Sequence, residues 1–204
     1  MNEIPINQII QGDCLEFMKT LPDNCIDLVL TDPPYGIKIS SNPVRQKHEK
    51  KEWDSFIPTQ EYFDEICRIS KEQIIWGGNY FGLPPSRGFI VWDKKQPESF
   101  SLAMCEMAWN SKDCNAKIFR QSVHKESANV HPTQKPVELM VWCLENYLLK
   151  KWDKDRRPIV FDGFAGSGTT GVACKKCGCD YILVEKEKDY CEIIEKRLAQ
   201  ETLF

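Results

Sequence analysis

The fold of this 204-residue chain is decided by residues 158–185, which read PIVFDGFAGSGTTGVACKKCGCDYILVE. The apolar ends of this stretch, 158–162 and 181–185, are typical of buried strands, and residues 168–177 between them predict a helix. A glycine-rich turn joins the first strand to that helix. Strand, helix and strand in this order form a βαβ unit, which predicts an α/β protein with a mostly parallel sheet.

The rest of the chain repeats the alternation of strands and helices. Residues 26–31 (IDLVLT) are nearly all apolar, as expected of a strand buried on both faces of a parallel sheet. The other predicted strands lie at 7–11, 73–76, 89–92 and 106–109, and the other predicted helices at 14–21, 60–70, 136–149 and 189–200. Polar sequence at 36–58 and 110–130 predicts loops.

The glycine-rich turn comes unusually late in the chain. In nucleotide-binding α/β folds it normally follows the first strand, but here only residues 186–204 follow its βαβ unit. The remaining strands must therefore come from the N-terminal part. The sequence predicts a single domain, 1–204, with a circularly permuted Rossmann-like order and helices on both faces of the sheet.

Composition excludes several classes of protein. No stretch approaches the roughly 20 apolar residues of a membrane span, and residues 1–10 do not resemble a signal peptide, so we expect a cytoplasmic protein with no membrane contact. The formal net charge of −3 excludes a uniformly basic nucleic-acid binder. One local segment is basic and fits either a solvated loop or a phosphate contact; it carries Lys38, Arg45, Lys47, Lys50 and Lys51.

Ten cysteines are scattered along the chain, several of them within apolar runs. Cys174, Cys177 and Cys179 have a spacing seen in metal sites, but no second ligand pair accompanies them. The three histidines, His48, His124 and His131, are not convincing ligands either. We therefore expect buried free thiols and no metal.

The turn at 161–171 (FDGFAGSGTTG) predicts a ligand site. Glycines allow the backbone to pass close to a ligand, and the N-terminus of the following helix favours a carboxylate or phosphate. Residues 166–171 also fit the GxGxxG pattern of NAD-binding proteins, and Glu185 could accept hydrogen bonds from ribose hydroxyls in either case. The segment indicates a nucleotide-type ligand without choosing which one.

The tetrapeptide Asp32-Pro33-Pro34-Tyr35 directly follows the apolar strand at 26–31. The carboxyl ends of central strands line the ligand crevice of such sheets. The two prolines stiffen the backbone and remove two N–H donors, Asp32 adds a carboxylate, and Tyr35 adds an aromatic ring. These groups suit the exocyclic amine of a flipped base, although a rigid turn at the end of a strand is the simpler alternative.

With both motifs in one chain, the sequence resembles the DNA amino-methyltransferases, which methylate adenine N6 or cytosine N4. Asp32 to Tyr35 matches the DPPY motif of that family, 162–170 is close to its DPFxGSGTT loop, and 131–136 matches its HPTQKP segment. The order is that of the permuted beta-type subgroup. Residues 11–14 (QGDC) and 76–79 (WGGN) extend the resemblance over nearly the whole chain, and Gly163 departs from it, because the family usually has proline there.

The resemblance implies an S-adenosyl-L-methionine-dependent methyltransferase fold and a set of cofactor-binding residues. Asp162, Gly166, Ser167 and Gly168 would surround the methionine part, and Thr169, Thr170 and Lys135 its carboxylate. Glu185 would bind the ribose and Asp13 would face the adenine. The full implied cofactor set is Asp13, Lys135, Asp162, Phe164, Gly166, Ser167, Gly168, Thr169, Thr170 and Glu185.

The implied activity is methylation of adenine N6 in double-stranded DNA, with Asp32, Pro33, Pro34 and Tyr35 as the catalytic residues. Cytosine-N4 methylation, RNA or protein amide methylation and a non-catalytic DNA-binding role stay open as alternatives. Segments 38–58 and 110–130 are the candidate DNA-contacting loops, and the second adds Lys117 and Arg120 to the basic residues above. Because 110–130 is short for reading a specific site, a homodimer is a further expectation.

Overall fold

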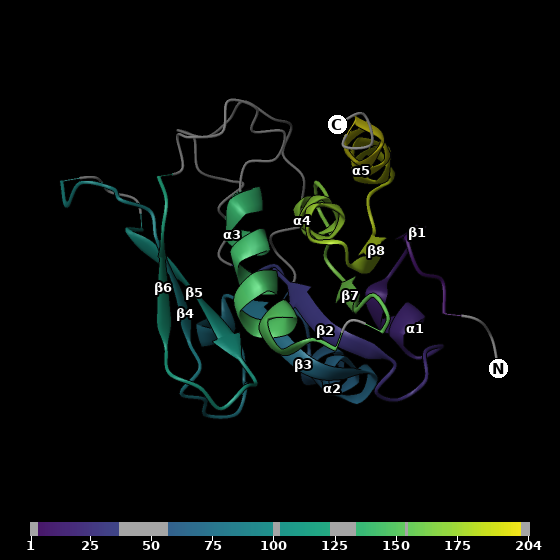
Figure 1. The fold of residues 1–204 in the computed structure, drawn as a ribbon, viewed down its shortest axis with the longest axis horizontal. Helices are drawn as coiled ribbons and strands as arrows, with labels where there is room; N and C mark the ends of the chain where they lie inside the picture. Colours follow the sequence, from purple (N-terminus) through teal and green to yellow (C-terminus); the bar gives the residue numbers. More distant parts are fainter. Residues whose placement is uncertain (1–3, 37–56, 100–102, 123–133, 154, 201–204) are drawn as a thin grey trace.

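The computed structural model describes residues 4–36, 57–99, 103–122, 134–153 and 155–200. Within them one sheet runs in the order β1-β8-β7-β2-β3-β5-β4-β6 (Figure 1). Its strands are β1 (Gln8–Gln11), β2 (Ile26–Thr31), β3 (Ser70–Trp76), β4 (Ile90–Asp93), β5 (Cys105–Asn110), β6 (Lys117–Arg120), β7 (Ile159–Asp162) and β8 (Asp180–Glu185). Only β5 runs antiparallel to its neighbours, β3 and β4. This confirms a mostly parallel sheet.

Strand β7, which carries the glycine-rich turn, lies in the middle of the sheet between β2 and β8. It comes late in the sequence but pairs with a strand from the N-terminal part, as the predicted permuted order requires. All six residues of β2 are buried, because this strand is paired on both sides and covered on both faces.

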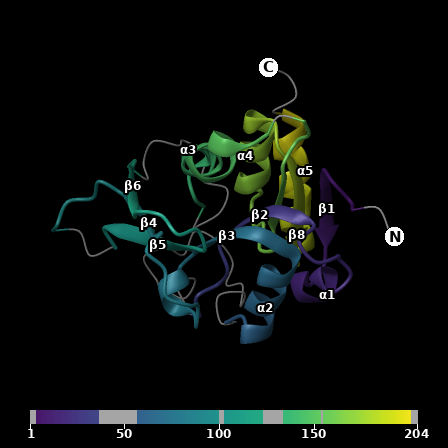
Figure 2. The same ribbon diagram turned by 60° about the horizontal axis from the view of Figure 1, so that its bottom comes forward.

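Helices cover both faces of the sheet (Figure 2). The lower face in that view carries α1 (Cys14–Met18) and α2 (Gln60–Ile69), which pack on side chains such as Val29 and Phe161. The upper face carries α3 (Val137–Cys143), α4 (Thr169–Cys177) and α5 (Lys188–Gln200). These three helices pack on Leu30, Leu183 and their neighbours, so each face has its own apolar core.

Helix α1 ends at Met18, before its predicted end at residue 21, and β3 begins at Ser70 instead of residue 73. Two further elements differ in kind from the sequence prediction. The helix predicted at 136–149 is α-helical only to Cys143, continues as a π-helical turn over Leu144–Leu148 and ends in a 3₁₀ turn over Leu149–Lys151. The segment 110–130 contains the strand β6, which pairs with β4. This strand is short and has Lys117 and Arg120 at its ends, as edge strands often do, so its sequence reads as polar loop.

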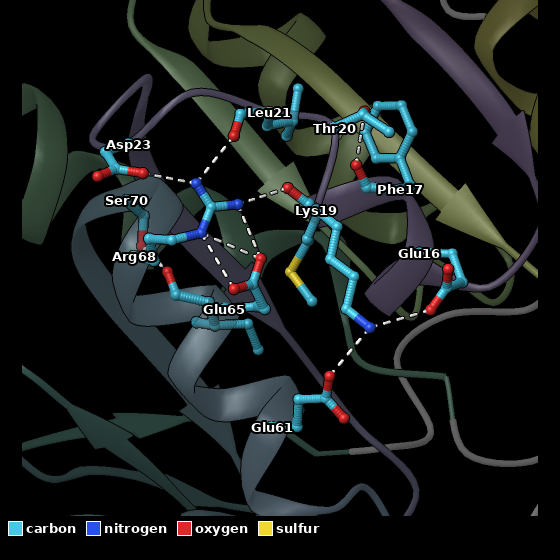
Figure 3. A network of polar contacts seen from close by, with 12 residues as sticks. Glu16, Phe17, Lys19, Thr20, Leu21, Asp23, Glu61, Glu65, Arg68 and Ser70 are labelled. Atoms are coloured by element: carbon cyan, nitrogen blue, oxygen red, sulfur yellow. Dashed lines mark hydrogen bonds and ion pairs between the residues drawn. The ribbon is translucent and has the colours of Figure 1, made fainter.

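Arg68, near the end of α2, holds the turn that leads from α1 into β2 (Figure 3). Its guanidinium donates to the carbonyl oxygens of Met18 at 2.7 Å and Leu21 at 2.9 Å. It also pairs with the carboxylates of Asp23 and Glu65, both at 2.7 Å. The last carbonyls of a helix lack intrahelical donors, and Arg68 supplies one from the neighbouring helix in addition to the backbone N–H groups of the turn.

We expect Arg68→Met to lower the free energy of unfolding by roughly 2 kcal/mol, because two carbonyls and two carboxylates lose their shared donor. Urea denaturation followed by circular dichroism measures this change. The matched control is Arg87→Met. The pair between Arg87 and Asp113 is largely exposed, so its loss should leave the free energy of unfolding almost unchanged. Equal losses in the two variants would show that Arg68 is only another surface cation.

Candidate active site

The glycine-rich turn after β7 has one packed side and one open side. Gly168 begins α4 with a left-handed φ of 80°, and a Cβ there would lie 2.8 Å from Cγ2 of Ile194. Gly166 is also left-handed, with φ 54°, but the nearest atom to its added Cβ would be 3.9 Å away. Glycine is therefore required for packing at Gly168, whereas none of the described residues crowds a Cβ at Gly166.

Asp162, at the end of β7, is buried and holds the turn from inside. Its Oδ1 accepts hydrogen bonds from Thr31 Oγ1 at 2.7 Å and from the Phe164 N–H at 3.1 Å. Its Oδ2 accepts one from Thr170 Oγ1 at 2.6 Å. Burial raises the pKa of Asp162 to about 6, although these hydrogen bonds oppose the shift. The carboxyl group thus joins β2, β7 and the start of α4.

Glu185, at the end of β8, braces the open side of the same turn. Its carboxylate accepts from the Gly166 N–H at 2.7 Å and from the Glu187 N–H at 2.8 Å, and burial raises its pKa. Asp13 follows the neighbouring strand β1, caps α1 and accepts from the Tyr62 hydroxyl at 3.1 Å. The ring of Phe164 lies 6.1 Å from that of Tyr62. Carboxylates and aromatic rings therefore border the turn, as a nucleoside site requires.

Other residues predicted for the cofactor are engaged within the protein. Ser167 and Thr169 are buried, and Ser167 Oγ accepts from Arg197 at 2.9 Å. The Thr170 hydroxyl donates to Asp162, and Lys135 binds carboxylates away from the turn, as described below. Thr170 and Lys135 thus have partners inside the fold, as a buried hydroxyl or ammonium requires, and their contact with the cofactor's carboxylate stays a prediction.

The DPPY segment leaves β2 at the same edge of the sheet as the glycine-rich turn. Oδ1 of Asp32 accepts from the Tyr35 hydroxyl, and Oδ2 accepts from Lys135 Nζ at 2.5 Å. The ring of Tyr35 stacks on Tyr80, with centroids 4.9 Å apart and an interplanar angle of 16°. Gly77 lies against Tyr35, and a Cβ there would be 2.0 Å from its ring. The WGGN segment therefore supports the DPPY tyrosine.

Four charged side chains form a line at this edge of the sheet, which we call the ion-pair row: Asp32, Lys135, Glu106 and Lys94. Lys135 Nζ lies 2.8 Å from Glu106 Oε2, and Lys94 Nζ lies 2.5 Å from Glu106 Oε1. Burial opposes ionisation, but Lys135 and then Lys94 outweigh it and lower the pKa of Glu106 to about 2. The two carboxylates likewise raise the pKa of Lys135, against the effect of its burial.

Glu106 and Lys94 were not among the residues predicted from the sequence. Neither belongs to a recognisable motif, and they join the site only because β4 and β5 lie beside β3 in the sheet. The available signal was a single acid, Glu106, within an otherwise apolar strand segment. A charge in such a position requires a partner.

The described DNA-contact candidates lie on the edge strand β6. Lys117 Nζ donates to Asn146 at 3.2 Å and lies 5.1 Å from the centroid of the Tyr147 ring, so it is partly engaged with the fold. Arg120 is exposed and pairs with Asp93 at 3.4 Å. The other candidates lie outside the described residues; they are Lys38, Arg45, Lys47, Lys50 and Lys51. Most of segment 38–58 and the first three residues of HPTQKP also lie outside the described residues.

The cysteine cluster lies at the end of α4. Cys174 and Cys179 are buried in the core, and the Cys179 N–H donates to the Cys174 carbonyl. In the described part of the chain, no group of three or more histidine, cysteine, aspartate or glutamate side chains could hold a metal ion. None of the described helices is long and apolar enough to cross a membrane.

The raised pKa of Asp162 predicts a pH dependence of stability. Between about pH 4, where the unfolded chain titrates, and about pH 6, the folded protein holds a proton that the unfolded chain has lost. The free energy of unfolding should therefore fall as the pH rises through this range. Asp162→Asn should flatten the fall by up to about 1.4 kcal/mol per pH unit, measured by urea denaturation at each pH.

The matched control for this measurement is Asp64→Asn, because Asp64 is exposed on α2. Its stability curve should run parallel to that of the wild type. If the Asp162→Asn curve is also parallel to the wild type between pH 4 and pH 6, Asp162 is ionised throughout and its pKa is not raised.

Comparisons with a family model and with known proteins agree on one family. Residues 75–196 match the DNA methylase family N6_N4_Mtase. The chain is 28% identical to the type II methyltransferase M.HinfI of Haemophilus influenzae, over 96% of this chain and 69% of that protein, and 26% identical to M2.MboI of Moraxella bovis, over 95% and 88%.

Solved structures agree. The M1.HpyAVI–SAM complex superposes with a TM-score of 0.61 at 25% identity, over 94% of this chain and 99% of that one. The cytosine-N4-specific PvuII DNA methyltransferase shares the fold, with a TM-score of 0.65 at 14% identity, over 95% of this chain and 90% of that one. The match to the family covers more than half of the chain, and the chain belongs to the N6/N4 DNA methylase family.

Proposed function

We propose that this protein transfers a methyl group from S-adenosyl-L-methionine to the N6 amine of adenine in double-stranded DNA. The observation that carries the proposal is the position of the Asp32 carboxylate. It lies after β2, directly beside β7 and its glycine-rich turn, and is held by Lys135 and Tyr35. An acceptor for an amine thus lies next to a site that suits a nucleoside cofactor.

The open side of the glycine-rich turn suits S-adenosyl-L-methionine. Free space borders the Gly166 backbone, and the Glu185 carboxylate beside it has further lone pairs for ribose hydroxyls. Asp13 and Phe164, which border the same turn, would contact the adenine of the cofactor. When bound, this cofactor supplies the electrophilic methyl group. The solved relative M1.HpyAVI forms a complex with SAM, which supports the assignment.

Asp32 would activate the amine that accepts the methyl group. The exocyclic nitrogen of adenine is a weak nucleophile, because its lone pair is delocalised into the ring. Hydrogen bonds from the amine to the Asp32 carboxylate and the Pro33 carbonyl would concentrate electron density on the nitrogen. Fixed acceptors of this kind are commonly worth several kcal/mol, roughly 3 to 4 for one group. No covalent intermediate with the protein is needed.

Tyr35 would stack on the flipped base. Its hydroxyl donates to Asp32, so the ring is fixed relative to the carboxylate. Burial raises the pKa of Tyr35, and the charge of Asp32 raises it further. The phenol therefore stays protonated and can donate. In the structure Tyr80 stacks on this ring and is 50% exposed. A flipped base would therefore stack on Tyr35 when the side chain of the exposed Tyr80 moves off its ring.

Cytosine-N4 methylation is the second candidate. The two acceptors at Asp32 and Pro33 fit the amine of either base, and the PvuII enzyme, which is named as cytosine-N4-specific, shares the fold. Adenine is favoured by Asp32 itself, since cytosine-N4 chemistry more often goes with serine before Pro-Pro-Tyr.

That two copies of the chain act together on DNA stays a prediction.

One assay separates these reactions. Protein, unmethylated DNA and isotope-labelled cofactor are incubated, the DNA is digested to nucleosides, and the labelled product is identified by mass spectrometry. We expect N6-methyladenine. Asp32→Ala should lower kcat by about 100-fold or more and leave the Kd of the cofactor unchanged, because of the two ligands Asp32 would contact only the substrate amine.

The control for this assay is Asp64→Ala, which removes an exposed carboxylate on α2 and should retain wild-type turnover. Labelled N4-methylcytosine would instead establish the second candidate. Near-normal turnover by Asp32→Ala would remove Asp32 from the mechanism, and a wild-type protein that labels no nucleoside would contradict the proposed function.

A further inference from the structure

We propose that Glu106 is a positioning residue for methyl transfer: it shares the Lys135 ammonium with Asp32 and thereby leaves Asp32 an electron-rich acceptor. The inference rests on the proposed function, because it concerns the same carboxylate. It adds a residue from β5 that no motif of the family suggested. Glu106 would act through Lys135 and would not touch the substrate.

The geometry places Lys135 between two competing carboxylates. Its Nζ lies 2.5 Å from Asp32 Oδ2 and 2.8 Å from Glu106 Oε2, and its side chain is only 4% exposed. A buried ammonium must have its charge compensated inside the protein. With one carboxylate only, that compensation would come entirely from Asp32. With two, each carboxylate carries part of it.

The row is built on a rigid part of the sheet. Glu106 lies on β5 opposite Trp92 of β4, and Lys94 after β4 holds the outer oxygen of its carboxylate at 2.5 Å. The Lys94 ammonium also lies 5.2 Å from the centroid of the Trp92 ring. The centroid of the Trp76 ring, at the end of β3, lies 5.6 Å from Lys135 Nζ. Neighbouring strands β2, β3, β5 and β4 therefore each contribute one side chain, and the position of Lys135 is fixed from both sides.

The charge balance of the row matters for the reaction. Positive charge develops on the amine nitrogen as it accepts the methyl group, so a net positive neighbour would oppose the transfer. Without Glu106, Lys135 would neutralise Asp32 fully, and Lys94 would leave the row with an excess positive charge. With Glu106 present, two acids and two bases balance, and the charge of Asp32 is available to the amine.

The same balance predicts a pH effect. The groups that face Asp32 are Lys135, Tyr35, Glu106 and Asp162. Burial raises the pKa of Asp32, Lys135 opposes this, and Glu106 raises it further. Removing the charge of Glu106 should therefore lower the pKa of Asp32 and move the acid limb of the kcat profile to lower pH. A residue that only stabilises the fold would not move this limb.

The experiment compares Glu106→Gln with the wild type at saturating DNA and cofactor. We expect kcat to fall by about ten- to hundredfold, as when a supporting partner of a functional group is lost, with the KM for DNA and the Kd of the cofactor unchanged. The acid limb of kcat should shift to lower pH. Glu106→Asp, which restores the charge with a shorter side chain, should recover part of the rate and return the acid limb to its wild-type position.

The matched control is Glu72→Gln. Glu72 lies on β3 and pairs with Lys112 at 3.2 Å. It is partly buried like Glu106 but does not contact the row, so the rate and pH profile of the Glu72→Gln variant should be those of the wild type. An active wild type together with an unchanged rate and pH profile for Glu106→Gln would overturn the inference alone. A wild type that makes no methylated adenine would instead overturn the proposed function.

Thermal denaturation establishes whether Glu106→Gln is folded. If it is not, Lys94→Met provides the second test, because it removes the outer partner of Glu106 and leaves that carboxylate to Lys135. Lys135 should then compensate Asp32 less, so we expect the acid limb of kcat to move to higher pH with an unchanged Kd of the cofactor. An unchanged acid limb in a folded Lys94→Met variant would overturn the inference.

Discussion

The ion pair between the buried ammonium of Lys135 and the partly exposed carboxylate of Asp32 is the contact on which the rest of the site depends. It joins two segments about a hundred residues apart in sequence, the end of β2 and the residue before Pro136 at the start of α3. Because the ammonium is almost fully enclosed, the pair fixes where the DPPY segment lies. Tyr35 is oriented by the same carboxylate, and Glu106 and Lys94 complete the charges around it.

A buried acid, Asp162, places the glycine-rich turn relative to this pair. It binds Thr31, the last residue of β2, and Thr170 in α4, so the strand that carries Asp32 is attached to the loop from inside. The permuted strand order makes this possible, since it sets β2 beside β7 although they are far apart in the chain. The DPPY segment and the glycine-rich turn therefore share one edge of the sheet.

Elements governed by local sequence were predictable, and long-range partners were not. The strand at 26–31 matches β2 residue for residue, because an apolar run that stops at two prolines has few alternatives. Strand β6 was missed, since charges at its ends hide a short edge strand. Lys135 was expected to hold the cofactor's carboxylate, which stays a prediction, whereas its contact with Asp32 and the position of Glu106 in the site were not predicted. Both contacts depend on which elements become neighbours in the fold, which no local pattern encodes.

The most direct measurement of the central claim is a double-mutant cycle on Asp32→Asn and Lys135→Met, using the single-turnover rate of methyl transfer at saturating DNA and cofactor. If Lys135 acts through Asp32, the double variant should be within about twofold of the slower single variant, because the lysine has nothing left to position. A double variant whose loss equals the product of the two single losses would show that the residues act independently and would contradict this account.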